Sequence, residues 1–212
     1  MKNLHCKPYM LSSFFHRIFY NVDDLFLFKK YFTVHHAVNS FFAYVFTQAD
    51  CFNLNQMSVS KTSGCLTFNE AKLIEFLKNR NLRKAINNLN VTPNIDYEAL
   101  EREEFQNPNY LPFRLSNNFV DLMGARGTGL HGMFAGVITA CSLAMGKYHE
   151  KILPLLNLVY RDDLNDDRDG NLLLISKSLD YIKFKMVSLS QNRQILNLDQ
   201  YLQDPEYVKM HR

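Results

Sequence analysis

The sequence predicts a mainly helical domain with one small β-hairpin, and three observations support this fold class. The 212 residues are 47% hydrophobic and 21% charged, which is typical of a globular domain with a core. Residues 25–48 place apolar side chains at helical intervals and contain neither glycine nor proline, which favours a long, largely buried helix. Residues 57–68 alternate with a period of two around the turn sequence Lys61–Gly64, as the strands of a hairpin do.

The two stretches that follow the hairpin differ in character. Residues 70–88 return to helical spacing and predict a second helix. Residues 90–110 are polar and contain Pro93 and Pro108, so we expect an irregular, partly exposed connection there.

The second half of the chain reads as a series of helices. Ser116 is a good N-cap for a short helix over residues 117–123, and Gly124 is suited to ending it. A glycine-rich turn follows. The remaining helices are expected over residues 130–148, 152–160, 172–191 and 195–203.

Charge and hydropathy exclude several classes of protein. The longest weakly polar run, residues 130–145, is interrupted by His131 and is shorter than the about 20 residues that a membrane-spanning helix needs. Residues 1–20 carry charged side chains and a proline, so no secretory signal is expected and an intracellular location is favoured. The net charge of +3 comes without any block of like charge, and nothing therefore requires nucleic acid or an anionic membrane as a partner.

Cysteine and histidine spacing gives no sign of a metal site. No C-x-x-C pair occurs, so we expect buried, reduced thiols instead of a disulfide framework or a zinc ribbon. His35 and His36 are neighbours on the long helix and point about 100° apart, which prevents both from binding one ion and favours structural roles. The four cysteines are Cys6, Cys51, Cys65 and Cys141.

Two short motifs imitate ligand sites. Residues 127–132 have the form G-x-G-x-x-G, but dinucleotide binding also needs a preceding strand, and residues 117–123 look like a capped helix. Residues 165–170 imitate the start of a calcium loop, yet Ser176 stands where the closing glutamate should be. No G-x-S-x-G motif supports a hydrolase.

A longer pattern carries a family resemblance. Residues 110–124 include Pro-Phe-Arg-Leu-Ser and resemble the helix after the activation segment of phosphatidylinositol-3-kinase-related kinases. Residues 28–46 are similar to the long C-lobe helix before the catalytic loop of that family, and residues 57–68 occupy the place of its hairpin. The resemblance implies the C-terminal lobe of a PI3/PI4-kinase-like, that is protein-kinase-like, domain. It also implies that one core contains Phe41, Tyr44, Val45, Phe119, Val120, Phe134, Val137 and Ile138.

Within this family the sequence is most similar to the TRRAP-like pseudokinases, on Phe28–Thr33 and Val159–Asp163. The resemblance implies three parts: residues 1–24, an N-terminal remnant of the lobe; residues 25–164, the kinase-like C-lobe; and residues 165–212, C-terminal helices. The last part resembles the FATC segment of the family. It is degenerate, because FATC segments usually end in bulky aromatic residues that include tryptophan, and this chain has no tryptophan.

The resemblance also places remnants of the catalytic positions. Active members use G-D-R-H-x-x-N, whose histidine and aspartate handle a proton and whose asparagine binds metal. Asp50 and Asn55 match this loop, but Phe52 replaces the histidine and cannot transfer a proton. Where Asp-Phe-Gly should follow the hairpin, Glu70 is the remaining carboxylate and Lys72 adds a competing positive charge. We therefore expect no catalytic residue, no metal and no cofactor.

The resemblance implies a non-catalytic scaffold or interaction module in a nuclear transcription co-activator subunit of SAGA-type histone acetyltransferase complexes. The implied partners are protein subunits of such complexes and transcription activators, without direct contact with nucleic acid or membrane. A fragment of an active lipid or protein kinase of the PI3/PI4-kinase-related group is the main alternative, which Phe52 disfavours. The 24 residues before the long helix also leave no room for an N-lobe. A small nucleotide-binding protein built on residues 127–132 is a third alternative.

Overall fold

The computed structural model describes residues 9–46, 57–68, 80–87, 95–106, 115–124, 132–164 and 169–191. These residues are mainly helical and include one two-stranded antiparallel sheet, which confirms the predicted fold class at this level. The helices are α1 (Met10–Ile18), α2 (Val22–Val45), α3 (Arg80–Asn87), α4 (Tyr97–Gln106), α5 (Asn117–Met123), α7 (Met133–Leu164) and α8 (Asp169–Gln191). The strands are β1 (Met57–Val59) and β2 (Leu66–Phe68). Within the described ranges, no helix combines the length and the apolar run that crossing a bilayer requires.

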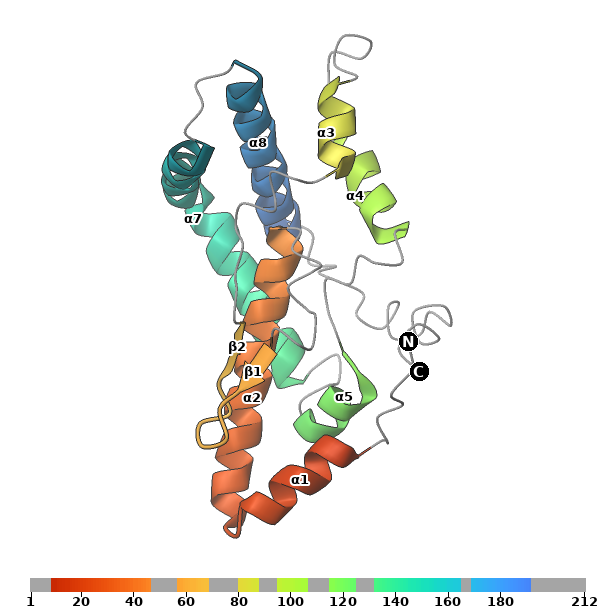
Figure 1. Ribbon diagram of the computed structural model, residues 1–212, viewed down its shortest axis with the longest axis vertical. Helices are drawn as coiled ribbons and strands as arrows, with labels where there is room; N and C mark the ends of the chain where they lie inside the picture. The colour runs from red at the N-terminus through yellow and green to blue at the C-terminus, as the bar shows by residue number, and fades with distance from the viewer. Residues whose placement is uncertain are drawn as a thin grey trace.

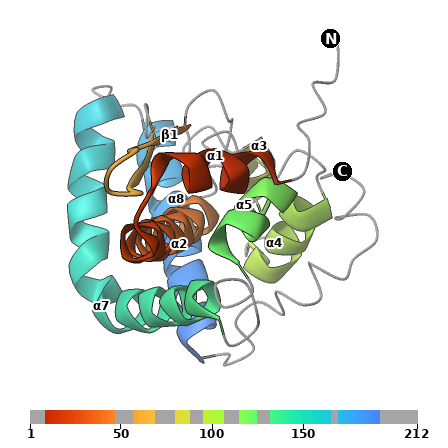
Figure 2. The same ribbon diagram turned by 90° about the horizontal axis from the view of Figure 1, so that it is seen from below.

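Helix α2 lies at the centre of the fold (Figures 1 and 2). It begins after Asn21, whose Oδ1 accepts a hydrogen bond from the backbone N–H of Asp23 at 3.1 Å. Asp23 and Asp24 then place negative charge at the positive end of the helix dipole. Viewed nearly along α2, the other helices and the hairpin lie around it (Figure 2). The predicted long helix is confirmed, with its start at Val22 set by the cap.

The hairpin confirms the period-two pattern. Met57 pairs with Phe68 and Val59 with Leu66 in antiparallel register. Gly64 has a φ of 69°, a left-handed conformation that glycine adopts without strain. The hairpin lies against α2, so a short strand pair that would be marginal alone is supported by a helix (Figure 1).

Helix α7 differs from the expectation of two separate helices over residues 130–148 and 152–160. It is continuous from Met133 to Leu164 and includes Pro154. Proline lacks an N–H and its ring crowds the carbonyl one turn before it, which bends a helix without necessarily ending it. Figure 2 shows α7 bending into two arms. Helix α8 packs along α7 and agrees closely with the expected helix over residues 172–191.

Helix α4 corrects the expectation of an irregular connection over residues 90–110. Asp96 caps it, because its Oδ1 accepts hydrogen bonds from the N–H groups of Glu98 and Ala99 at 3.1 and 3.0 Å. Pro93 precedes the helix and Pro108 follows it, so the prolines lie beyond its ends and do not interrupt it. The inward face includes the polar Glu104, which hides the helix from a search for apolar periodicity.

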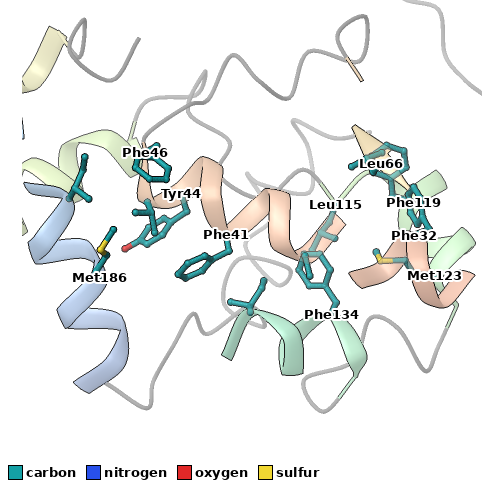
Figure 3. Packing of buried hydrophobic residues seen from close by; sticks show 14 of the residues in the cluster. Phe32, Phe41, Tyr44, Phe46, Leu66, Leu115, Phe119, Met123, Phe134 and Met186 are labelled. Carbon is teal, nitrogen blue, oxygen red and sulfur yellow. The ribbon is translucent and has the colours of Figure 1, made fainter. Parts of the chain in front are cut away.

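One core joins segments that are distant in sequence (Figure 3). Six of the eight residues expected to share a core are buried in it, and Val120 and Val137 are partly buried and pack against it. The core also includes Phe15 of α1 and Met186 of α8, so both ends of the described chain contribute. The packing of the long helix with the helices that follow is therefore confirmed.

Candidate functional site

The candidate kinase-like positions are tied to α2 and the hairpin. Asp50, Phe52 and Asn55 fall between the end of α2 and the start of β1, and Glu70 follows the end of β2. All four lie outside the described residues. The elements that flank these positions in the sequence, α2 and the hairpin, are described. Their contacts are given below.

The hairpin is held on α2 by specific contacts. The side-chain amide of Asn39 donates a hydrogen bond to the carbonyl of Leu66 at 3.1 Å. At Gly64, an added Cβ would lie 2.5 Å from the carbonyl oxygen of Phe28, so only glycine permits this approach. The hairpin therefore has one defined position on α2.

The two neighbouring histidines of α2 face different surroundings. His36 is fully buried, and its ring lies 5.9, 5.0 and 5.5 Å from those of Phe32, Phe119 and Phe134, between centroids. The Nε2 of His35 instead lies 3.4 Å from the Sγ of Cys65 on the hairpin. The expected divergence of the pair is confirmed, and His36 has the structural role that the sequence suggested.

Helix α5 packs against α2 and α1. The Ser116 side chain accepts a hydrogen bond from the N–H of Phe119 at 3.4 Å, and Gly124 ends the helix with a φ of 73°, as predicted. The ring of Phe119 meets that of Phe32 edge to face at a centroid distance of 5.4 Å. Asn118 fastens α1 to this helix, because its Oδ1 accepts from the N–H of Met10 at 3.0 Å.

A buried ion pair lies where α2, α4 and α8 meet, and sequence reasoning missed it. The Nζ of Lys185 donates to Glu104 Oε2 at 2.9 Å and to the carbonyl of Tyr44 at 3.3 Å. The hydroxyl of Tyr181 donates to the same Glu104 oxygen at 2.8 Å. The side chains of the two charged residues are 0% and 4% exposed, so the attraction between them offsets part of the cost of removing each charge from water.

Aromatic rings enclose this ion pair. The Lys185 Nζ lies 4.5 Å from the ring centroid of Tyr181 and 5.1 Å from that of Tyr44, whose hydroxyl donates to Glu101. Tyr97 stacks on Tyr181, and burial, with a smaller contribution from the charge of Asp180, raises the pKa of Tyr97 to about 12. The cluster is built to hold a charge away from water and to join three helices.

The sequence nonetheless carried one signal for this cluster. The inward face of α8 follows a helical stripe, and Lys185 falls on it beside the apolar positions of the same stripe. A lysine at such a position must be paired. Its partner Glu104 is 81 residues away, in the stretch 90–110 whose polar sequence predicts an irregular connection. The sequence therefore gives no sign that Glu104 points into the core.

Metal and nucleotide sites gain no support from the described parts of the chain. No group of three or more histidine, cysteine, aspartate or glutamate side chains gathers there in a way that suits a metal ion. The G-x-G-x-x-G motif follows helix α5, and the sheet that the structure does describe is antiparallel, whereas dinucleotide binding uses parallel strands. Residues 125–131 and 165–168, which hold most of both motifs, lie outside the described residues.

The cysteine prediction needs a correction. Cys65 and Cys141 are free thiols, but both are half-buried, not fully buried. Cys65 stands at the end of the exposed hairpin turn and Cys141 on the flank of α7, where each keeps some contact with solvent. Cys6 and Cys51 lie outside the described residues.

Two groups of large apolar side chains are exposed. The first follows α1 and the start of α2, with the α1 members spaced by four residues: Met10, Phe14, Ile18, Tyr20, Val22, Phe26, Leu27 and Tyr31. The second lies on the later part of α7: Tyr148, Leu155, Leu158 and Val159. Leu158 and Leu155 are 70% and 66% exposed, and they lie one turn apart on α7.

Comparison with known proteins adds no identity. No protein family, curated protein or solved structure matches this chain.

Proposed function

We propose that the chain is the C-terminal lobe of a TRRAP-like pseudokinase of the phosphatidylinositol-3-kinase-related family and acts by contact instead of catalysis. The packing of the resembling segments on one another is the observation that carries this proposal. The hairpin and α5 both contact α2, and α7 packs along α2 as well. Segments that resemble one family in order and spacing thus also form one structural unit, which supports a common origin.

The residues at the kinase-like positions favour loss of catalysis. Phosphoryl transfer depends on positioning and on cations that neutralise the phosphates. Phe52 has no group to accept the hydroxyl proton, and Glu70 is the only carboxylate offered beside Asn55 as a metal ligand. The alternative, a fragment of an active lipid or protein kinase, requires these residues to hold Mg-ATP.

Calorimetric titration of Mg-ATP into the full-length parent protein that both hypotheses imply, together with a radiolabelled phosphate-transfer assay, separates the two hypotheses. We expect no micromolar binding, and Phe52→His alone should not restore phosphate transfer, because the nucleotide would still lack its metal and its phosphate contacts. Micromolar binding that is lost in Asn55→Ala or Glu70→Ala would overturn the pseudokinase proposal in favour of the kinase. Asp23→Asn, on the exposed start of α2, is the matched control for a changed charge.

The contact function is assigned to partners in the nucleus: protein subunits of histone acetyltransferase complexes and transcription activators. The exposed leucines of α7 support such a role, because large apolar groups on a helix surface are typical of interfaces. The test is affinity purification of the tagged chain from nuclear extract, followed by a histone acetyltransferase assay. We expect activity to co-purify with the chain and to fall in the double variant Leu155→Glu, Leu158→Glu. Purification without acetyltransferase activity would contradict the proposal.

A further inference from the structure

The hairpin places one thiol against one imidazole. The Sγ of Cys65 and the Nε2 of His35 are 3.4 Å apart, within hydrogen-bond range for sulfur. Both residues are half-buried, and the adjoining turn residues Lys61, Thr62 and Ser63 are exposed, so the pair lies next to a solvent-exposed turn. We propose that Cys65 is a thiol-modification site, activated by His35, that reacts with small disulfides such as oxidised glutathione.

The pair is fixed by the fold and is not a chance approach of two mobile side chains. His35 lies on the central helix, and the strand after Cys65 is hydrogen-bonded to that helix through Asn39. Just before Cys65, Gly64 seats the turn against the carbonyl of Phe28. The backbone of Cys65 is itself hydrogen-bonded, since its carbonyl accepts from the N–H of Ser60 at 2.9 Å. The fold thus holds the Cys65 thiol within hydrogen-bond distance of the His35 imidazole.

Cys141 provides an internal comparison. It is also half-buried, but it lies on α7, and among the residues that the structure describes no histidine ring is hydrogen-bonded to it. Burial raises the pKa of the Cys141 thiol, which lowers the fraction present as the reactive thiolate. Two thiols of similar exposure therefore differ in the group beside them.

The reaction is an ordinary thiol–disulfide exchange. His35 takes the proton of the Cys65 thiol, and the thiolate attacks one sulfur of oxidised glutathione. A new sulfur–sulfur bond joins Cys65 to one glutathione while the original disulfide bond breaks. The second glutathione leaves as a thiolate and takes the proton from the imidazolium. Cys65 is oxidised, one glutathione is reduced, and no other oxidant is needed.

The test is mass spectrometry of peptides from the full chain after timed incubation with oxidised glutathione. Cys65 should be modified at least about tenfold faster than Cys141, because its thiolate forms beside a proton acceptor. In His35→Gln the Cys65 rate should fall by about the same factor while the Cys141 rate is unchanged. His16→Gln, at an exposed position on α1, is the matched control and should change neither rate.

Two results would overturn the proposal. Equal modification of Cys65 and Cys141 in the unaltered chain would do so without any variant, so the test survives even if His35→Gln fails to fold. An unchanged Cys65 rate in a His35→Gln chain with the same circular dichroism as the parent would do so as well. The site does not rest on the pseudokinase proposal, and its failure or success leaves the Mg-ATP titration to be judged separately.

Discussion

Lys185 is a charge placed where a helical core normally has an aliphatic side chain. Removing an ammonium group from water is costly, and the cost is offset only where its donors are satisfied. The carboxylate of Glu104 and the carbonyl of Tyr44 accept from it, and two tyrosine rings present their faces to it. The pair therefore fixes the position of α4 relative to α2 and α8 more than it adds net stability.

Breaking this pair from one side should be strongly destabilising. Lys185→Met leaves the Glu104 carboxylate buried without its counter-ion, and we expect a loss of about 3–5 kcal/mol in the free energy of unfolding, measured with urea. The double variant Lys185→Met, Glu104→Leu should recover much of that loss, because neither charge of this pair then remains in the core. Lys183→Met, an exposed position on the same helix, is the control and should change stability by no more than about 0.5 kcal/mol. Equal stability of Lys185→Met and the control would contradict the energetic role of the pair.

At the level of elements, the hairpin depends on an approach to α2 that only glycine allows. Gly64 and Gly124 both have positive φ values, of 69° and 73°. They differ in surroundings, because an added Cβ at Gly64 would collide with the Phe28 carbonyl, whereas one at Gly124 would meet none of the described residues within 4 Å. Alanine substitutions at Gly124 and Gly64 therefore separate the cost of a strained backbone from the cost of a steric collision.

Gly64→Ala should displace the hairpin from α2, and Gly124→Ala should not. For Gly124→Ala we expect a cost of about 1–3 kcal/mol from the strained backbone alone. Gly64→Ala should cost more, since strain and collision add, and it should also speed hydrogen exchange of the hairpin amides. Exchange followed by mass spectrometry on both variants tests this. Unchanged hairpin exchange in a folded Gly64→Ala chain would show that the turn adapts without leaving the helix.

Elements with strong local signals were the predictable ones. The hairpin followed from period-two alternation around a turn, and α5 from a serine cap and a terminal glycine, all of which act within a few residues. Helix α4 was missed because its inward face carries a glutamate whose stabilising partner is on α8. Helix α7 was expected as two helices over residues 130–148 and 152–160, the second including Pro154, yet the helix continues without a break through residues 149–151.

At the scale of the whole molecule, contacts between distant segments determine features that residue patterns do not predict. The Lys185–Glu104 pair joins residues 81 positions apart, and the hydrogen bond from Asn118 to Met10 spans 108. Residue patterns predicted which residues are buried but not which polar groups meet inside the core. The kinase-like positions were inferred from a resemblance, and they lie outside the described residues. The structure describes the elements on either side of them in the sequence, which are α2 and the hairpin.

The surface of the molecule has the two exposed apolar groups described above. Both involve side chains that proteins usually shield, and they lie on different helices, α1 with α2 and α7. A lobe that functions inside a larger assembly has such surfaces because partners cover them there. Within the described ranges these side chains are exposed, and burying them against another copy is favourable.

We therefore expect the isolated chain to associate with itself in a concentration-dependent way, measured by size-exclusion chromatography with light scattering. Leu155→Lys, Leu158→Lys should reduce association if the α7 group drives it, and Phe14→Lys, Phe26→Lys should do so if the α1 and α2 group does. Each pair replaces exposed side chains, so the fold itself should be retained. A monodisperse, cooperatively melting monomer at every concentration would show that the chain is self-contained, and it would remove the surface argument for an interaction module.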